Sequence, residues 1–281
     1  MTLRQVKTKF QNELKELYPL DEINSMCNLL IFDQLGLTTI DLALQPNIIL
    51  KQCDLDFFSN AITALLREKP VQYILGKTEF YGLKFNGNNN VLIARPETEE
   101  LVDWIIKETD NKQNLNILDI GTGSGCIAIS LAKHLPTATV TSLDISEEAL
   151  KTAEKNAAIN NVHIQLLKKD ILKFSPEKLQ YDIIVSNPPY VRELEKREIK
   201  NNVLLHEPHL ALFVKNDNPL LFYEKIADFA KKQLNRNGIL YFEINQYLST
   251  ETVNLLKLKG FQNIELRKDI FTNYRMIKAT L

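Results

Sequence analysis

One short segment of the 281-residue chain constrains its fold more than any other. Residues 115–120, Leu-Asn-Ile-Leu-Asp-Ile, form an apolar run that is typical of a buried strand. A glycine-rich loop follows directly, and an apolar helix is predicted next, over residues 126–135. Glycines allow the backbone to turn tightly and to approach a ligand, and the first N–H groups of the helix face the loop. A strand, a glycine loop and a helix in this order open the nucleotide-binding domains of α/β proteins. The loop residues are Gly121, Thr122, Gly123, Ser124 and Gly125.

The chain after this segment alternates between predicted strands and predicted helices. Helices are expected over residues 146–159, 219–234 and 249–259, and further strands over residues 139–143, 162–168, 181–186 and 238–244. Residues 261–267 and 274–279 are expected to form a closing antiparallel pair. This alternation predicts a Rossmann-like α/β fold, which is a mostly parallel sheet with helices on both faces.

Polar side chains follow several of these strands directly. Asp144 follows the second strand, Asp170 follows the third with Ile171 beside it, and Asn187 follows the fourth. Ligands bind to such sheets at the carboxyl ends of the strands, and an acidic residue about 20 positions after the glycine loop reaches ribose hydroxyls. We therefore expect the loop, Asp144, Asp170 and Asn187 to line one crevice.

The fourth strand ends in Asn187-Pro188-Pro189-Tyr190. Prolines cannot donate hydrogen bonds and hold the backbone in fixed turns, so the Asn187 amide and the Pro188 carbonyl are left without ladder partners. Two acceptors can take the two protons of a planar NH2 group while the tyrosine ring limits its tilt. The alternative is a proline-rich turn that only ends a strand.

The loop spacing narrows the classes of ligand. A dinucleotide loop reads Gly-x-Gly-x-x-Gly, whereas this loop reads Gly-x-Gly-x-Gly after Asp119, which disfavours an NAD-dependent oxidoreductase. No Gly-Lys-Ser/Thr follows, so motif logic excludes a triphosphate P-loop. His206 and His209 lack the neighbouring cysteines of a metal site, and no metal is expected.

Three parts are expected along the chain. Residues 1–75 show apolar positions at three- and four-residue steps and predict a small helical domain. Residues 76–94 alternate around glycine and asparagine and predict a β-hairpin linker, with its turn at residues 86–90. Residues 95–281 form the α/β domain. Its first helix opens at Arg95-Pro96-Glu97-Thr98-Glu99, with proline and acidic residues in the first turn.

The composition bounds the partners and the compartment. A formal net charge of −1 gives no sign of a strongly basic surface, so no direct nucleic-acid partner is expected. Three scattered cysteines indicate reduced thiols, and no apolar run has membrane-spanning length. The residues after Met1 show no apolar signal segment. We expect a cytoplasmic protein without a membrane partner, and a monomer. The charged run over residues 192–198 predicts a solvated helix face.

The pattern Asp119-x-Gly121-x-Gly123-x-Gly125 resembles the first motif of class I S-adenosylmethionine-dependent methyltransferases. The resemblance implies that the loop contacts the methionine part, Asp144 the ribose, and Asp170 and Ile171 the adenine. It also places Asn187 among the cofactor contacts. Asn187-Pro188-Pro189-Tyr190 is similar to the tetrapeptide of methyltransferases that act on NH2 groups of adenine, cytosine or glutamine. In that resemblance Asn187, Pro188 and Tyr190 are catalytic, and all four residues hold the substrate.

Further segments resemble the bacterial release-factor glutamine methyltransferases, the PrmC/HemK family. This likeness implies S-adenosylmethionine as methyl donor. It also implies, as substrate, the glutamine of the Gly-Gly-Gln loop in class 1 peptide chain release factors, which the N-terminal domain helps to hold. Two alternatives remain at this point: glutamine methylation of a ribosomal protein, and adenine-N6 methylation of a nucleic acid. A non-catalytic cofactor-binding module is disfavoured by the intact Asn187 motif. The segments are residues 70–76, 79–82, 91–93 and 95–99.

The chain departs from the family pattern at the expected rim of the pocket. Ala94 stands for a proline, Lys169 for a glycine, and Ile171 for a residue that is often aromatic. His206-Glu207-Pro208 replaces Tyr-Glu-Pro, and residues 215–218 replace a glycine-rich segment. Both central motifs are intact, so the resemblance implies the same chemistry with an altered rim.

Overall fold

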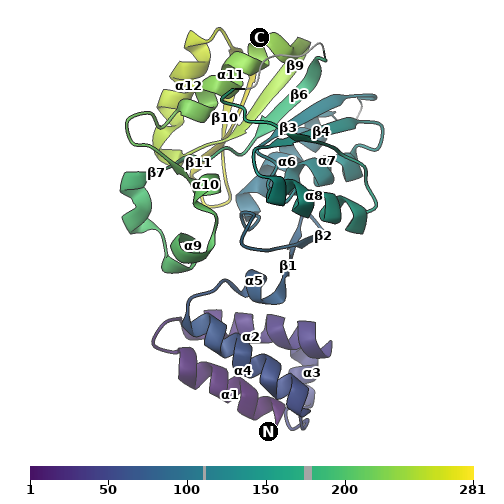
Figure 1. The fold of residues 1–281 in the computed structure, drawn as a ribbon, viewed down its shortest axis with the longest axis vertical. Coiled ribbons are helices and arrows are strands. Elements are labelled where there is room, and N and C mark those ends of the chain that lie inside the picture. The colour runs from purple at the N-terminus through teal and green to yellow at the C-terminus, as the bar shows by residue number, and fades with distance from the viewer. Residues whose placement is uncertain (110–111, 174–178) are drawn as a thin grey trace. The chain divides into compact units, whose positions relative to one another are not determined.

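The structure, a computed structural model, describes residues 1–109, 112–173 and 179–281 (Figure 1). The chain forms two compact units. The smaller consists of Met1–Gly76 and Lys200–His206, and the larger of Lys77–Ile199 and Glu207–Leu281. The expected division into 1–75, 76–94 and 95–281 differs from this in two places. The hairpin belongs to the larger unit, and a short segment far along the chain groups with the smaller one.

The smaller unit is helical. Its core forms where apolar side chains recur at three- and four-residue steps, including Phe10, Leu30 and Phe58, which are all buried. Thr2 caps the first helix in a capping box with Gln5. The helices are α1 (Leu3–Leu14), α2 (Leu20–Leu35), α3 (Thr39–Leu44), α4 (Gln52–Leu66), α5 (Val71–Leu75) and α9 (Asn201–His206).

Helix α9 is attached to the smaller unit by two hydrogen bonds to the residues that follow α4. His206 Nε2 lies 2.8 Å from the carbonyl oxygen of Arg67, and Asn201 Nδ2 donates to Glu68 Oε2 at 3.0 Å. The sequence holds no local signal for these contacts, because they join residues more than 130 positions apart.

The predicted hairpin exists, but its predicted turn is wrong. Strands β1 (Lys77–Phe80) and β2 (Leu83–Asn86) pair antiparallel and are joined by Tyr81 and Gly82. Both turn residues have positive φ (+49° and +71°), as in a two-residue turn that matches the twist of its strands. The asparagine-rich run 86–90, where the turn was expected, follows the second strand instead. A glutamate explains this choice: Glu99 Oε1 accepts the Tyr81 N–H at 2.8 Å.

The larger unit is built on a seven-stranded sheet with the order β10-β11-β9-β6-β3-β4-β5. The five strands from β9 to β5 are parallel, and β11 and β10 close the edge in antiparallel fashion, as predicted. Successive strands run from β3 outward to β5 and then return to β6 on the other side of β3. The strands are β3 (Asn116–Ile120), β4 (Thr139–Asp144), β5 (Gln165–Lys168), β6 (Tyr181–Ser186), β9 (Leu234–Glu243), β10 (Gln262–Lys268) and β11 (Tyr274–Thr280).

Helices cover both faces of this sheet (Figure 1). One apolar cluster joins α6 (Pro96–Thr109), α7 (Cys126–His134) and α8 (Glu147–Ile159) to the strands, and a second joins α11 (Leu221–Gln233) and α12 (Ser249–Leu258) to them. These helices lie where they were predicted. The remaining short elements are β7 (Val191–Arg192), η1 (Glu193–Glu198), α10 (His209–Leu212), β8 (Phe213–Val214) and η2 (Gln246–Leu248).

The hairpin is fixed to the larger unit by apolar packing and by one buried amide. Phe80 and Phe85 are buried in the first apolar cluster and meet edge to face. Asn156 of α8 is fully buried. Its Oδ1 accepts the Asn86 N–H at 2.7 Å, while its Nδ2 donates to the carbonyls of Asn86 (3.3 Å) and Ser124 (2.9 Å). The hairpin is therefore tied to the glycine loop through Asn156.

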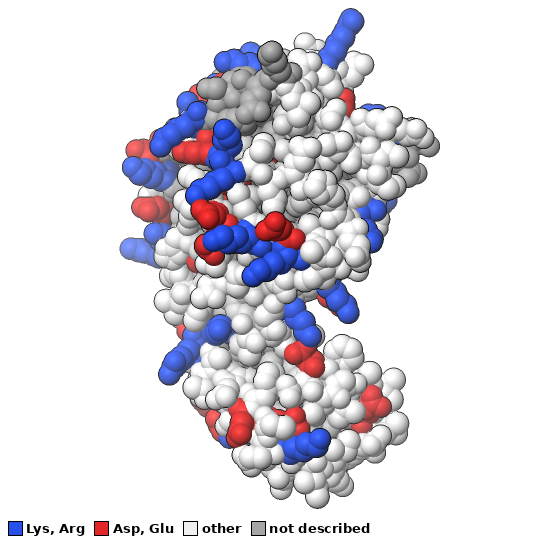
Figure 2. Space-filling view, turned by 45° about the vertical axis from the view of Figure 1, so that its right-hand side comes forward, with Lys and Arg blue, Asp and Glu red and all other residues white. Residues whose placement is uncertain are grey.

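Charged side chains of both signs are interspersed on the face shown in Figure 2. Local ion pairs in the larger unit include Lys151 with Glu148 (2.8 Å) and Lys168 with Glu147 (2.7 Å). Among the described residues, no helix is both long enough and apolar enough to cross a lipid bilayer.

Gly125 offers a test of how tightly α7 and α8 pack. A Cβ at Gly125 would lie 2.8 Å from Ile129 Cδ1 and 3.1 Å from Ala153 Cβ, and its φ of +82° strains any other residue. We expect Gly125→Ala to lower the free energy of unfolding by about 2–4 kcal/mol, through overpacking and backbone strain. Urea unfolding followed by the fluorescence of Trp104, the single tryptophan, reports on this unit.

Gly82→Ala is the matched control, because Gly82 also has positive φ (+71°) but no atom lies within 4 Å of the place that a Cβ would take. Gly82→Ala should lower the free energy of unfolding by only about 1 kcal/mol, the cost of the backbone strain alone. Equal losses in the two variants would contradict the tight contact between the helices.

Candidate active site

The glycine loop turns at the carboxyl end of β3 with all three glycines in the left-handed region. Their φ values are +77° for Gly121, +55° for Gly123 and +82° for Gly125, which side-chain-bearing residues rarely adopt. The N–H groups of Gly121 and Thr122 both donate to the carbonyl of Leu143, at 2.7 and 3.1 Å. The neighbouring strand β4 therefore fixes the shape of the loop.

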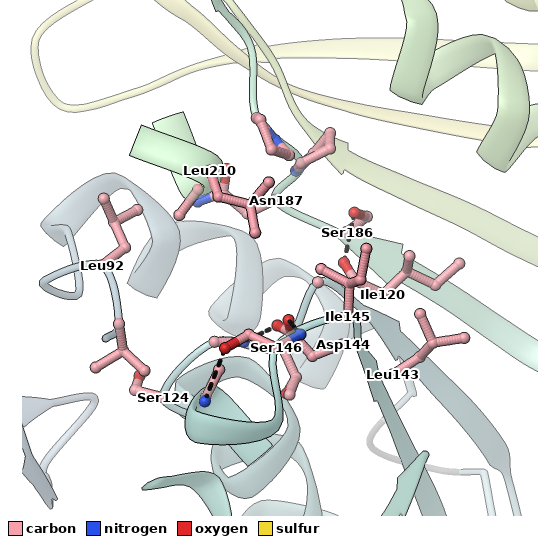
Figure 3. A pocket seen from close by; sticks show the side chains of 18 of the residues that line it. Leu92, Ile120, Ser124, Leu143, Asp144, Ile145, Ser146, Ser186, Asn187 and Leu210 are labelled. Atoms are coloured by element: carbon pink, nitrogen blue, oxygen red, sulfur yellow. Dashed lines mark hydrogen bonds between the residues drawn. The ribbon is translucent and has the colours of Figure 1, made fainter. Parts of the chain in front are cut away.

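Asp144 ends β4 and holds the loop from the other side. Its Oδ2 accepts the Gly123 N–H and its Oδ1 accepts the Ser146 N–H, both at 2.9 Å (Figure 3). Burial raises the pKa of Asp144, and these backbone donors lower it in part. Each carboxylate oxygen retains a lone pair for a further donor, so the group can also accept hydrogen bonds from a ligand hydroxyl.

Asp119 lies beneath the loop and is fully buried. Its Oδ2 accepts the Thr122 hydroxyl at 2.6 Å, whereas its Oδ1 has no hydrogen-bond partner in the described part of the chain. Burial raises the pKa of Asp119 to about 7; the Thr122 hydroxyl opposes this shift, and the nearby charge of Asp144 adds to it.

A cavity of about 250 Å³ opens at this edge of the sheet (Figure 3). It brings together most of the predicted site residues, from the ends of β3, β4, β5 and β6. Gly125 and Tyr190 are described but do not contribute to the lining: Gly125 packs against α8, and Tyr190 packs against the α11 side of the sheet. The predicted residues that do line it are Gly121, Thr122, Gly123, Ser124, Asp144, Asp170, Ile171, Asn187, Pro188 and Pro189.

Asn187 stands where β6 leaves the sheet, beside the glycine loop. A Cβ on Gly121 would lie 4.0 Å from the Asn187 carbonyl oxygen, and the Ser186 hydroxyl donates to the Ile120 carbonyl at 2.6 Å (Figure 3). The Asn187 Nδ2 group donates to Thr98 Oγ1 at 3.4 Å. The two halves of the site are therefore joined directly.

Tyr190 is held by its polar atoms. Its hydroxyl donates to Glu243 Oε1 at 2.9 Å, and its carbonyl accepts Asn245 Nδ2 at 3.0 Å. Burial, with the charge of Glu243, raises the pKa of Tyr190 well above its ordinary value. The hydroxyl therefore stays protonated and serves as a donor that anchors the Pro-Pro turn.

Sequence reasoning missed the residues behind Asn187. The sequence patterns indicate Thr98 only as part of a helix opening and Glu243 only as part of a strand, and they assign no role to Asn245. Glu243 is 1 % exposed and accepts the Thr98 hydroxyl at 2.6 Å in addition to Tyr190. One signal was available: Glu243 lies at the carboxyl end of a parallel strand, which is where Asp144 and Asn187 were found.

The charged run after the motif also differs from its prediction as a solvated face. Arg192 and Glu195 form an ion pair (2.6 Å), and Glu195 is only 5 % exposed. Glu195 accepts from the Arg192 backbone and guanidinium and from Asn245 Nδ2. The run therefore anchors the end of the Pro-Pro-Tyr turn, because a tertiary contact with Asn245 draws Glu195 inward.

The rim carries the departures noted in the sequence. Ala94, Lys169 and Ile171 line the cavity. Glu207 is buried, pairs with Arg95 at 2.6 Å and accepts the Ile93 N–H at 3.4 Å, so it fixes the segment before α6. Cys126 also lines the cavity, and burial raises the pKa of its thiol to about 12. Over residues 1–109, 112–173 and 179–281 no group of histidine, cysteine and acidic side chains is arranged to hold a metal ion.

Two family models match the chain. Residues 5–76 match the PrmC N-terminal domain and residues 98–215 the Methyltransferase small domain. The solved T. thermophilus 16S rRNA N2 G1207 methyltransferase, in complex with AdoMet and guanosine, shares the fold with a TM-score of 0.53. It is 19% identical, over 73% of this chain and 49% of that one. The fold and the family model define the class: an S-adenosylmethionine-dependent methyltransferase.

Relatives of known name cover nearly the whole chain. A release factor glutamine methyltransferase of Flavobacterium psychrophilum is 51% identical over 99% of both chains. One of Bacteroides thetaiotaomicron is 42% identical, again over 99% of both. The chain belongs to the release factor glutamine methyltransferase family.

The buried Asp119 gives a pH-dependent test of the site. Its pKa in the folded protein is about 7, against about 3.9 in an unfolded chain, so the folded state binds the extra proton between these values. The free energy of unfolding, relative to the Asp119→Asn variant, should therefore decrease as pH rises through this window and level off above pH 7. The slope is at most about 1.4 kcal/mol per pH unit.

Urea unfolding of both proteins at pH 5, 6, 7 and 8, followed by Trp104 fluorescence, measures this difference. A difference that stays constant over the four pH values would show that Asp119 is ionised throughout.

Proposed function

We propose that this protein transfers the methyl group of S-adenosylmethionine to the side-chain amide nitrogen (N5) of a glutamine. The proposed substrate is the Gly-Gly-Gln loop of class 1 peptide chain release factors. The observation that carries the proposal is that Asn187 and Pro188 line the same cavity as the glycine loop and Asp144. Relatives 51% and 42% identical over 99% of the chain, which are named release factor glutamine methyltransferases, support the choice of substrate.

The residues of the cavity fit the methyl donor. Asp144 has free lone pairs for the ribose hydroxyls, and Asp170 and Ile171 offer a polar and an apolar contact for the adenine. The glycine loop allows the methionine part to approach the backbone without steric conflict. S-adenosylmethionine supplies an electrophilic methyl group on a sulfonium centre.

The Asn187 motif suits an amide nitrogen that gains positive charge. An amide is a poor nucleophile because its lone pair is delocalised into the carbonyl. The Asn187 side-chain oxygen and the Pro188 carbonyl, as acceptors for the two NH2 protons, stabilise the nitrogen as its positive charge develops and orient it. Cys126 remains a protonated thiol, so it does not compete for the methyl group.

The remaining assignments belong to the same proposal. The helical residues 1–75 hold the release factor. The hairpin residues 76–94 link them to residues 95–281, which carry the chemistry. Tyr190 acts by fixing the Pro-Pro turn through its hydroxyl and carbonyl. We expect a monomer that works in the cytoplasm and needs no nucleic acid. The mixed charges on the face in Figure 2 support this last point.

A labelling assay tests the substrate. Purified protein with methyl-labelled S-adenosylmethionine should label a class 1 release factor and not its variant with alanine in place of the Gly-Gly-Gln glutamine. A ribosomal protein fraction and duplex DNA serve as the competing acceptors. Label on DNA alone, on the ribosomal fraction in preference, or equally on the alanine variant would refute the proposed substrate.

A pair of variants separates binding of the donor from transfer. Asn187→Ala should bind S-adenosylmethionine in calorimetry with an affinity within about threefold of wild type. It should lose at least about 100-fold in kcat, because a transition-state acceptor is removed. Asp144→Asn should instead weaken donor binding by about tenfold or more, because a carboxylate acceptor for hydroxyls is replaced. Normal turnover in Asn187→Ala would remove Asn187 from the mechanism.

A further inference from the structure

Behind Asn187 lies a chain of hydrogen bonds that ends on the buried carboxylate of Glu243. The two carboxylate oxygens of Glu243 accept separate hydroxyls, Oε2 from Thr98 at 2.6 Å and Oε1 from Tyr190 at 2.9 Å. Burial raises the pKa of Glu243, whereas the two hydroxyls and the nearby positive charge of Arg275 lower it. A carboxylate with a hydroxyl donor on each oxygen is satisfied in its ionised form.

This arrangement determines the direction of the next hydrogen bond. A threonine hydroxyl has one proton, and the short bond to Glu243 uses it. Thr98 Oγ1 can then only accept, and the group that faces it, at 3.4 Å, must be the NH2 of Asn187. The side-chain oxygen of Asn187 lies on the other branch of the planar amide, where it can accept protons from a ligand. A rotated amide would instead place two acceptors, Oδ1 and Oγ1, face to face.

We propose that Thr98 and Glu243 are positioning residues that fix the side-chain amide of Asn187 with its oxygen, and not its NH2 group, toward the substrate amide. The inference rests on the proposed function and assigns the orientation of its central residue. With the amide rotated by 180°, Asn187 would present donors to the two protons of the glutamine NH2, and that pairing is repulsive. The hydroxyl of Thr98, a residue that lines the same cavity, therefore selects the productive orientation.

The position of Thr98 suits this role. It lies in the first turn of α6, is 2 % exposed, and reaches a strand end 145 positions along the chain. The Thr98 backbone N–H donates to the Arg95 carbonyl at 3.1 Å. The start of the helix is therefore stabilised by a backbone hydrogen bond that does not involve the Thr98 side chain. A valine at this site keeps the shape and the β-branch and removes only the hydroxyl.

The matched variants are Thr98→Val and Thr98→Ser, assayed with S-adenosylmethionine and a release factor. Thr98→Val should lower kcat by about tenfold or more, the worth of one buried hydrogen bond in the transition state, while the donor Kd stays within about twofold. Thr98→Ser retains the hydroxyl and should stay within about threefold of wild-type kcat. Wild-type kcat in Thr98→Val, or equal losses in both variants, would overturn the role of the hydroxyl.

Glu243→Gln tests the other end of the chain. A carboxamide has one oxygen and one NH2 group, so one of the two hydroxyls, which now donate to separate oxygens, would face a donor. We expect a loss of kcat of several-fold or more with an unchanged donor Kd. Unchanged kcat would remove Glu243 from the proposal.

A spectroscopic measurement keeps this inference separate from the choice of substrate. In protein labelled with ¹⁵N-asparagine, the Asn187 NH2 signal is assigned by its loss in Asn187→Asp. In wild type and in Thr98→Ser, the proton that donates to residue 98 should be shifted downfield and should exchange slowly with solvent. In Thr98→Val this proton should lose its downfield shift and exchange faster. The same signal in all three proteins would refute the positioning role even if the release factor is methylated. A protein inactive on release factors that shows the expected signals would fail only the proposed function.

Discussion

The site depends on the parallel pairing of β3 with β6. These strands are about 65 positions apart in sequence, and their register places Ile120 beside Ser186. The Ser186 hydroxyl extends this pairing by one further bond, to the Ile120 carbonyl. The glycine loop and the Asn-Pro-Pro turn begin at the very next residues, so each starts at a position that the sheet has already set. Neither segment could define the cavity alone, because each supplies part of its lining.

Most of the fold could be predicted from the sequence because apolar residues recur with different periods in its strands and in its helices. The short apolar runs that end in Asp144 and Ser186 were recognised with their carboxyl ends correct, and the polar residues after them were expected together. The hairpin turn was placed wrongly because asparagine and glycine are strong turn residues wherever they occur. In the structure the turn forms at Tyr81-Gly82, where the Tyr81 N–H donates to Glu99. This is a tertiary contact, and local sequence patterns carry no signal for it.

The residues around the site were harder to predict than those within it. Thr98, Glu195 and Glu243 are ordinary polar residues in sequence, and each gains its role from a partner on another element. Glu195 illustrates this, since a run of alternating charge predicts a solvated surface until Asn245 offers a buried partner. Contacts of this kind are fixed by packing, and a single sequence carries no periodic signal for them.

The buried amide of Asn156 limits what evolution can place at that position. One acceptor and two donors are all engaged, with Asn86 on the hairpin and with the carbonyl of Ser124 in the glycine loop. Aspartate has no donors in its ionised form, serine has only one, and glutamine would have to fit a longer side chain into a fully packed space. Position 156 therefore tolerates asparagine and little else, although it does not line the cavity. Substitutions in the hairpin are therefore tolerated only where they leave the backbone of residue 86 within hydrogen-bond distance of the Asn156 side chain.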